Sequence, residues 1–174
     1  MPIVKSTTET IASTCEIYYG GVNMGHTKGP ITVTVNKTTF DVTVNEFGPN
    51  VPVNSFSLGT SATVEIPLAQ VSTEVMAEII PEAVTVSGGT ANEAIYVADT
   101  TGTDMLSLAK ELIVAPRDGS PQWKFPAAFV GDEFSVPYQL DEQTVISVTM
   151  KAIPDPSNPT ASSSVFKFER NAYF

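Results

Sequence analysis

The chain has 174 residues, enough for one sizeable hydrophobic core but not for two, so we expect a single domain with extensions at its ends. Its 19 acidic residues outnumber its 9 basic ones, which gives a formal net charge of -10 and argues against a grip on nucleic-acid phosphates. Only 16% of the residues are charged, a more neutral composition than most soluble monomers have and one typical of an assembly subunit.

The cysteine content and the hydropathy of the chain exclude several classes of protein. Cys15 is the only cysteine, so the sequence has no intrachain disulfide framework and no cysteine cluster for a metal. We expect Cys15 to be a small buried residue of a strand. The first residues lack a continuous apolar segment, and no stretch approaches the length of a bilayer crossing, so we expect neither a secretion signal nor a membrane anchor.

The N-terminal part begins with residues 1–11, which are polar and threonine-rich and which we interpret as a flexible or partner-dependent arm. A first strand is expected at 13–19. The glycine-rich segment 20–29 has the glycine spacing of a phosphate loop, but His26 and Thr27 replace the Lys-Ser/Thr pair that this motif requires. We therefore interpret it as a turn whose glycines permit positive φ.

Three segments, 31–35, 40–45 and 62–66, alternate apolar and polar residues as half-buried strands do. Turn residues at 48–50 separate the second from the third. Two interpretations of this loop stay open, because single exposed apolar residues are common: a protruding hairpin with an apolar tip, or apolar residues that fold back on the core. Pro67 indicates an edge position or a bulge in its strand.

A short helix is predicted at about 72–80. Ser72 is placed to cap its first turn, Glu74 complements the positive end of its dipole, and Pro81 ends it. Its apolar residues fall on one face, so the helix should lie with that face on the sheet.

The second half of the chain reads as a series of antiparallel connections. Short strands are expected at 83–86 and 94–97, and 108–116 has helical and strand features, of which we favour a strand in a hairpin with 123–130. A long strand follows at 144–152. Beyond the Pro/Ser-rich linker 154–164, the C-terminal segment should add a strand to its own sheet or to a neighbour's edge.

Together these elements predict a mainly β fold, an antiparallel β-sandwich or barrel with one short flanking α-helix. The predicted organisation has three parts: a flexible N-terminal arm at 1–11, a β domain at 12–153, and a linker with a C-terminal strand or arm at 154–174.

No arrangement of residues in the sequence predicts catalysis. His26 is the only histidine, and nothing around it resembles the third group that holds a catalytic base. The adjacent acids at 132–133 and 141–142 lie beside turn residues, where solvated charge is the usual explanation, and no calcium-loop or zinc-ligand spacing is present. We expect no enzyme, no cofactor and no metal.

The order of these elements resembles that of bacteriophage tail tube (major tail) proteins. The resemblance covers about 12–168, and because each motif is a degenerate β pattern, its specificity comes from their order. The segments that carry it are the glycine-rich loop with the alternating strands after it, 64–70 leading into 72–81, 125–130, and 145–155.

The resemblance implies a β-sandwich or barrel with one flanking helix, assembled as hexameric rings that stack into a hollow tube for the genome. Such a subunit belongs to the tail of the virion and assembles in the host cytoplasm. Its partners are copies of itself and the tape-measure, tail terminator and tail-tip proteins. DNA passes without specific binding, and an acidic lumen would let it slide, since like charges give no counterion-release affinity.

Site residues follow only loosely from this resemblance. The residues proposed to face the lumen are the polar members of the alternating strands, Thr32, Thr34, Asp41, Thr43, Thr63 and Glu65. The alternative for them is an outer, solvated sheet face. The residues proposed to contact other subunits or rings are apolar residues of the 46–54 loop and of the C-terminus: Phe47, Val51, Val53, Phe166, Phe168, Tyr173 and Phe174.

Two other functions remain open at this point. One is a monomeric β-sandwich module that binds carbohydrate or a receptor, for which Trp123 and Tyr138 are the best aromatic pair, although a Trp in a strand is more often part of a core. The other is the tube subunit of a bacterial contractile or secretion apparatus, which shares the architecture and differs in what passes through it.

Overall fold

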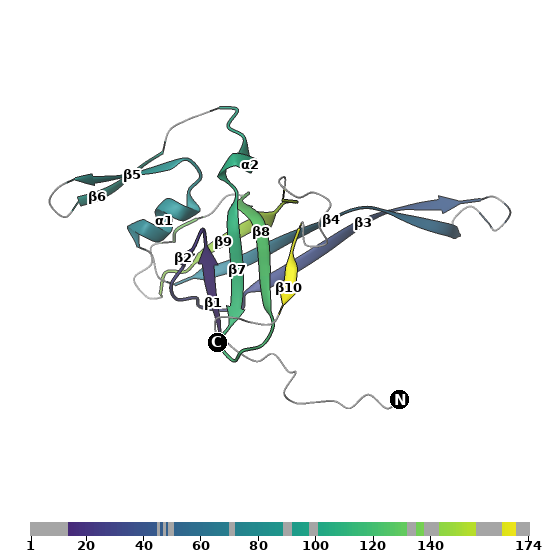
Figure 1. Ribbon diagram of the computed structural model, residues 1–174, viewed down its shortest axis with the longest axis horizontal. Coiled ribbons are helices and arrows are strands. Elements are labelled where there is room, and N and C mark those ends of the chain that lie inside the picture. Colours follow the sequence, from purple (N-terminus) through teal and green to yellow (C-terminus); the bar gives the residue numbers. More distant parts are fainter. Residues whose placement is uncertain are drawn as a thin grey trace.

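The fold is mainly antiparallel β, as predicted. The computed structural model (Figure 1) describes residues 14–44, 46, 48, 51–69, 72–88, 92–97, 101–131, 135–137, 143–155 and 165–169. Its elements are β1 (Cys15–Tyr19), β2 (Val22–Asn23), β3 (Thr32–Thr43), β4 (Pro52–Leu68), α1 (Thr73–Ile79), β5 (Ala83–Gly88), β6 (Asn92–Val97), α2 (Met105–Leu108), β7 (Lys110–Pro116), β8 (Gln122–Val130), β9 (Ile146–Ala152) and β10 (Lys167–Glu169).

One large sheet contains most of these strands in the order β2-β1-β7-β8-β9-β4-β3, and β5 and β6 form a separate two-stranded sheet. In Figure 1, β3 and β4 run across β1, β7 and β8 instead of alongside them. The inner faces of these two groups of strands share one core. Its largest fully buried side chains are Phe125, Ile17, Met24, Ile66, Leu68, Ile79, Leu112, Ile146, Met150, Val64 and Val148.

Strand β8 joins the two groups because its partner changes along its length. Its first residues lie between β7 and β10, whereas Ala128, Phe129 and Val130 pair with β9. The Tyr19 hydroxyl donates a hydrogen bond of 3.1 Å to the Ala128 carbonyl from the neighbouring part of the core. Burial raises the pKa of Tyr19 to about 12, so this hydroxyl remains a donor.

The predicted helix is confirmed with its cap. The Val75 amide donates to the Ser72 hydroxyl oxygen at 3.2 Å, and Val75 and Ile79 are buried on its inner face. The sequence prediction of one helix missed α2, a single turn in which the Asp104 carboxylate accepts from the Leu106 amide at 3.0 Å.

The glycine-rich segment after β1 is a turn, as predicted, but it also contains a strand that the sequence analysis missed. Gly20 and Gly21 have φ of 58° and 85°, which glycine adopts without strain, and they connect β1 to the two-residue strand β2. Met24 follows and is fully buried, with its amide bonded to the Ile17 carbonyl at 2.9 Å.

The prediction of separate strands at 31–35 and 40–45 is wrong. Residues 32–35 and 40–43 belong to one continuous strand, β3, and 62–66 is only the part of the 17-residue strand β4 near its end. Pro67 pairs with Ser147 of β9, but β3 begins only at Thr32, opposite Glu65, so Pro67 lies at a locally open edge of β4, one of the two positions predicted for it. The Pro67 carbonyl accepts from the Lys28 amide at 3.0 Å, beyond the end of β3, so the missing proline N–H falls on the side where the ladder has stopped.

The β7–β8 hairpin and the β9 strand occur as predicted, with Ile146, Val148, Met150 and Ala152 all buried on one face of β9. The C-terminal strand β10 pairs with β8 of the same chain, which places Phe168 opposite Trp123. Of the two options for the C-terminal strand, this chain therefore adopts closure of its own sheet.

Replacing the helix cap tests the account of α1. Ser72→Ala removes the acceptor for the Val75 amide, so the free energy of unfolding should fall by about 1 kcal/mol. Urea unfolding followed by circular dichroism measures it. Ser57→Ala, at an exposed strand position, is the matched control and should change little; equal losses in both variants would contradict the capping role.

Candidate assembly surfaces

The β3–β4 hairpin projects from the body of the protein as a two-stranded ribbon. Strand β9 pairs with β4 only as far as Ala62, which lies opposite Ala152. Beyond this position β3 and β4 pair with each other alone, and Figure 1 shows the ribbon extending well past the rest of the molecule. We call residues 36–43 and 52–61 the arm.

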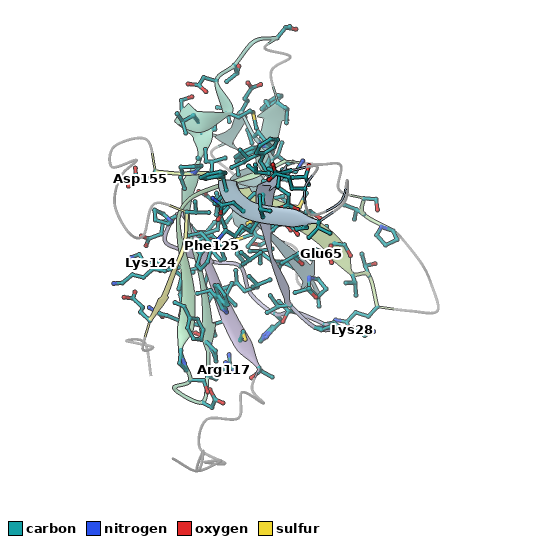
Figure 2. The ribbon with its side chains drawn as sticks, turned by 90° about the vertical axis from the view of Figure 1, so that its right-hand side faces the viewer. Lys28, Glu65, Arg117, Lys124, Phe125 and Asp155 are labelled. Atoms are coloured by element: carbon teal, nitrogen blue, oxygen red, sulfur yellow. The ribbon has the colours of Figure 1, made fainter. Side chains whose placement is uncertain are left out.

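Near the body, the faces of β3 and β4 follow ordinary strand alternation. Val33 lies opposite Val64, which is fully buried in the core. Thr32 pairs with Glu65 and Thr34 with Thr63, so these four side chains share the outer face. On β9, Ser147, Thr149 and Lys151 extend the same face. We call these seven residues the hydroxyl face; Figure 2 shows Glu65 and Lys28 on this side of the molecule.

A β-bulge changes the pattern where the arm begins. Thr38 pairs with Gly59 but Thr39 pairs with Ser57, so Leu58 has no opposite residue in β3. With unshifted pairing Phe40 would face Ser57; the extra residue instead brings Phe56 opposite Phe40. The two rings are 57% and 54% exposed. The arm therefore carries a solvated aromatic pair on the face that it shares with Thr32 and Thr34.

The six residues that the sequence analysis grouped for the lumen do not share one face. Thr32, Thr34, Thr63 and Glu65 do, but Asp41 and Thr43 are odd-numbered positions of the same continuous β3 and point to the opposite side from Thr32 and Thr34. The grouping was wrong because it treated 31–35 and 40–45 as separate strands. In the first segment the polar residues have even numbers and in the second odd numbers, so on one continuous strand they point to opposite faces.

The proposed inter-subunit residues have different environments. Val51 and Val53, at the end of the arm, are 49% and 45% exposed, so the option that they fold back on the core is wrong. Phe47, Tyr173 and Phe174 lie outside the described residues. Phe166 is half-buried against the core, which is inconsistent with a freely exposed contact residue.

An aromatic cluster lies on one face of β8 and runs from the buried Phe125 to the half-exposed Phe168 of β10. The Trp123 ring stacks on Phe125 at 6.2 Å between centroids and meets Phe166 at 5.3 Å and Phe168 at 4.9 Å. Tyr138, its suggested partner in a carbohydrate site, lies outside the described residues. Trp123 thus contributes to holding β10 on the sheet, and Figure 2 shows the neighbouring Phe125 and Lys124 directed to opposite sides of β8.

The β5–β6 hairpin is a second exposed ribbon, which the sequence analysis did not identify as a surface. Val84 pairs with Tyr96, so both side chains lie on one face, and they are 58% and 62% exposed. Val97 pairs with Ala83 on the other face of the ribbon and is 56% exposed. Figure 1 places this hairpin at the end of the long axis opposite the arm.

Ion pairs occupy much of the basic charge. Lys110 pairs with Glu78, Lys167 with Glu169, and Lys124 with Glu111 at 2.8 Å. Arg117, which is labelled in Figure 2, follows β7 and lies 2.8 Å from Glu16. The Tyr18 hydroxyl also donates to Glu16 at 2.6 Å. That hydrogen bond is the largest single cause of the lowered pKa of Glu16, and the hydrogen bond and charge of Arg117 lower it further.

The described residues form no recognisable centre for chemistry. No group of three or more His, Cys, Asp or Glu side chains within them could hold a metal ion. His26 is exposed. Cys15 is half-buried, less than the sequence analysis expected, and its burial, with Asp118 nearby, raises the pKa of the thiol, which keeps it protonated and unreactive. Neither described helix has the length and apolar composition that a membrane crossing requires.

Comparison with known proteins adds no relative. Neither the models of protein families nor the curated proteins contain a match to this chain. Its function therefore has to be argued from its own surfaces.

The Glu16 cluster gives a pH test of the β1 surface. A depressed folded-state pKa contributes stability above the unfolded pKa of about 4.5, and this is lost as pH falls through the folded pKa. Glu16→Gln should therefore lower the free energy of unfolding at pH 7, and the difference from wild type should shrink by pH 3. Urea unfolding at both pH values measures it.

The Tyr18→Phe background supplies the control. Because the tyrosine hydroxyl is the largest single cause of the lowered pKa, Glu16→Gln should reduce the free energy of unfolding less at pH 7 when Tyr18 is already replaced. An equal cost in both backgrounds would show that Arg117, and not Tyr18, sets the stability of this carboxylate.

Proposed function

We propose that this chain is a structural subunit of a phage tail tube, which assembles into hexameric rings that stack into a conduit for the genome. The observation that carries this proposal is the arm, a long two-stranded ribbon with an exposed aromatic pair. Two-stranded ribbons are marginally stable alone in water, so an arm of this kind favours a bound partner.

The exposed area of the arm favours association. Phe40 and Phe56 each leave about half of the ring in water, on the order of 100 Å² per side chain. At about 25 cal/mol per Å², covering each ring would gain roughly 2–3 kcal/mol before the costs of association. Leu58, which is 66% exposed, lies beside them and would add to this gain.

The open edge of the sheet supports repeated association of one chain. Strand β3 is last in the strand order, and no other described strand pairs with its outer edge. A 12-residue open edge is a template for pairing with another chain. Closing a ring of identical subunits is one way to satisfy such edges, because each subunit gives an edge and receives one.

The hydroxyl face suits the wall of a DNA channel. It carries Thr and Ser with one acid, Glu65, and one base, Lys151, and a second base, Lys28, lies at its margin. Glu65 pairs with Thr149, and Lys151 pairs with Thr63. A wall so close to neutral offers phosphates no cluster of cations, so it releases few counterions and holds DNA weakly. For this face the support is for a neutral wall more than for the acidic one that the sequence analysis expected.

Electron microscopy of the purified protein over a concentration series tests the proposal. We expect rings or hollow tubes of uniform width at high concentration. Particles that stay small and monodisperse at every concentration, with the mass of one subunit by light scattering, would contradict it.

The arm variant Phe40→Ser/Phe56→Ser tests which surface drives assembly. It should abolish tubes while leaving the circular dichroism spectrum unchanged, because both rings are outside the core. The matched control is Thr39→Ser/Ser57→Ala, which alters the adjacent pair on the opposite face of the arm and should still assemble. Loss of tubes in the control as well would show that the aromatic face is not specifically required.

A further inference from the structure

Among the described residues, two ribbons with exposed apolar side chains lie at opposite ends of the long axis (Figure 1). At one end is the aromatic face of the arm, formed by Phe40 and Phe56 with Val42 on the same side of β3. At the other is the β5–β6 face with Val84 and Tyr96. The two surfaces differ in sequence and are too far apart to meet within one chain.

We propose that the β5–β6 face of one copy is the acceptor for the arm of another, so that identical subunits bind head to tail. This inference deepens the proposed function and rests on its claim that the chain self-assembles. It names what the arm binds, a second copy of this chain, and where on that copy it binds.

The position of the two faces decides the type of contact. An arm that bound another arm would give an isologous pair, which closes at two copies. If instead the arm binds the opposite end of the next copy, every open oligomer has one free arm at one end and one free acceptor at the other. Further copies can then add until the oligomer closes into a ring or extends as a tube. Only the second arrangement satisfies both exposed faces of every interior subunit.

The chemistry of the two faces is compatible. The arm residues on the aromatic face, including Asn36, Thr38 and Asn54, carry no charge. Val84, Ala94 and Tyr96 on the acceptor face are also uncharged. No charged group among these residues would have to be desolvated, in keeping with the depletion of charge at interface cores. Tyr96 would meet the phenylalanine pair while its hydroxyl remains at the wet rim.

The available area is adequate for a specific contact. Leu58, the unpaired residue of the bulge, adjoins the phenylalanine pair and adds to the apolar area of the arm. Together with the phenylalanine pair, Val84 and Tyr96, the two surfaces offer apolar area on the order of 500 Å². With a polar rim around such a centre, the contact reaches the roughly 1,000 Å² that a specific interface needs.

Two variants, each defective at one end, test the inference by complementation. The arm variant is Phe40→Ser/Phe56→Ser, and the acceptor variant is Val84→Ser/Tyr96→Ser. Neither alone should grow in sedimentation velocity beyond its basal species, a subunit or a single ring. In an equimolar mixture, the acceptor variant supplies an intact arm and the arm variant supplies an intact acceptor face. A species of twice the basal mass that contains both variants should therefore appear, and it should grow no further.

The outcomes separate this inference from the proposed function. If the acceptor variant alone forms tubes as the wild type does, the arm binds elsewhere and the inference is overturned, while the proposed function stands. The same holds if the mixture shows no doubling although wild type forms tubes. If the wild-type protein itself never assembles, both the proposed function and this inference are wrong.

A crosslink provides a direct check that does not depend on loss of assembly. In a Cys15→Ser background, Phe56→Cys and Tyr96→Cys on separate copies should form an intermolecular disulfide on mild oxidation of the mixed proteins. Phe56→Cys paired with Ser61→Cys on the other copy is the control and should crosslink at least ten times less. Equal crosslinking of both pairs would overturn the proposed contact.

Discussion

The pairing of β4 with β9 is the constraint on which the rest of the structure depends, and it ends at Ala62 and Ala152. Where the pairing exists, β4 has a covered side, and Val64, Ile66 and Leu68 are buried. Where it has ended, both faces of the β3–β4 ribbon are in water. The same two strands therefore build the core at one end and an exposed arm at the other.

The face of β3 that carries the apolar residues changes between the body and the arm. Near the body they occupy the inward positions, as at Val33, and in the arm they occupy the positions that face outward with Thr32 and Thr34, as at Phe40. The bulge at Leu58 adjusts β4 so that Phe56 joins Phe40 across the ladder. Such an arrangement has no benefit for an isolated subunit, since it exposes aromatic rings to water. In a subunit that assembles, it would provide an apolar surface for binding another copy.

Much of the fold could be predicted from local signals. The Ser72 cap defined α1, the turn after Pro116 defined the β7–β8 hairpin, and alternation defined β9. The candidate surfaces were harder, because which side of a strand is covered depends on pairing between distant segments. For this reason Asp41 was grouped with Thr32 although the two lie on opposite faces of β3. The exposure of Tyr96 was missed because an apolar run does not reveal that its ribbon stands apart from the large sheet.

Hydrogen exchange of the arm amides tests the central claim, that a second copy covers the arm, most directly. The amides of 36–43 should exchange rapidly in dilute protein and become protected at assembling concentrations, while those of β9 remain equally protected in both. This result would show that assembly buries the arm. Arm amides that exchange equally fast in subunits and in tubes would show that the arm stays in water, and the account would be wrong.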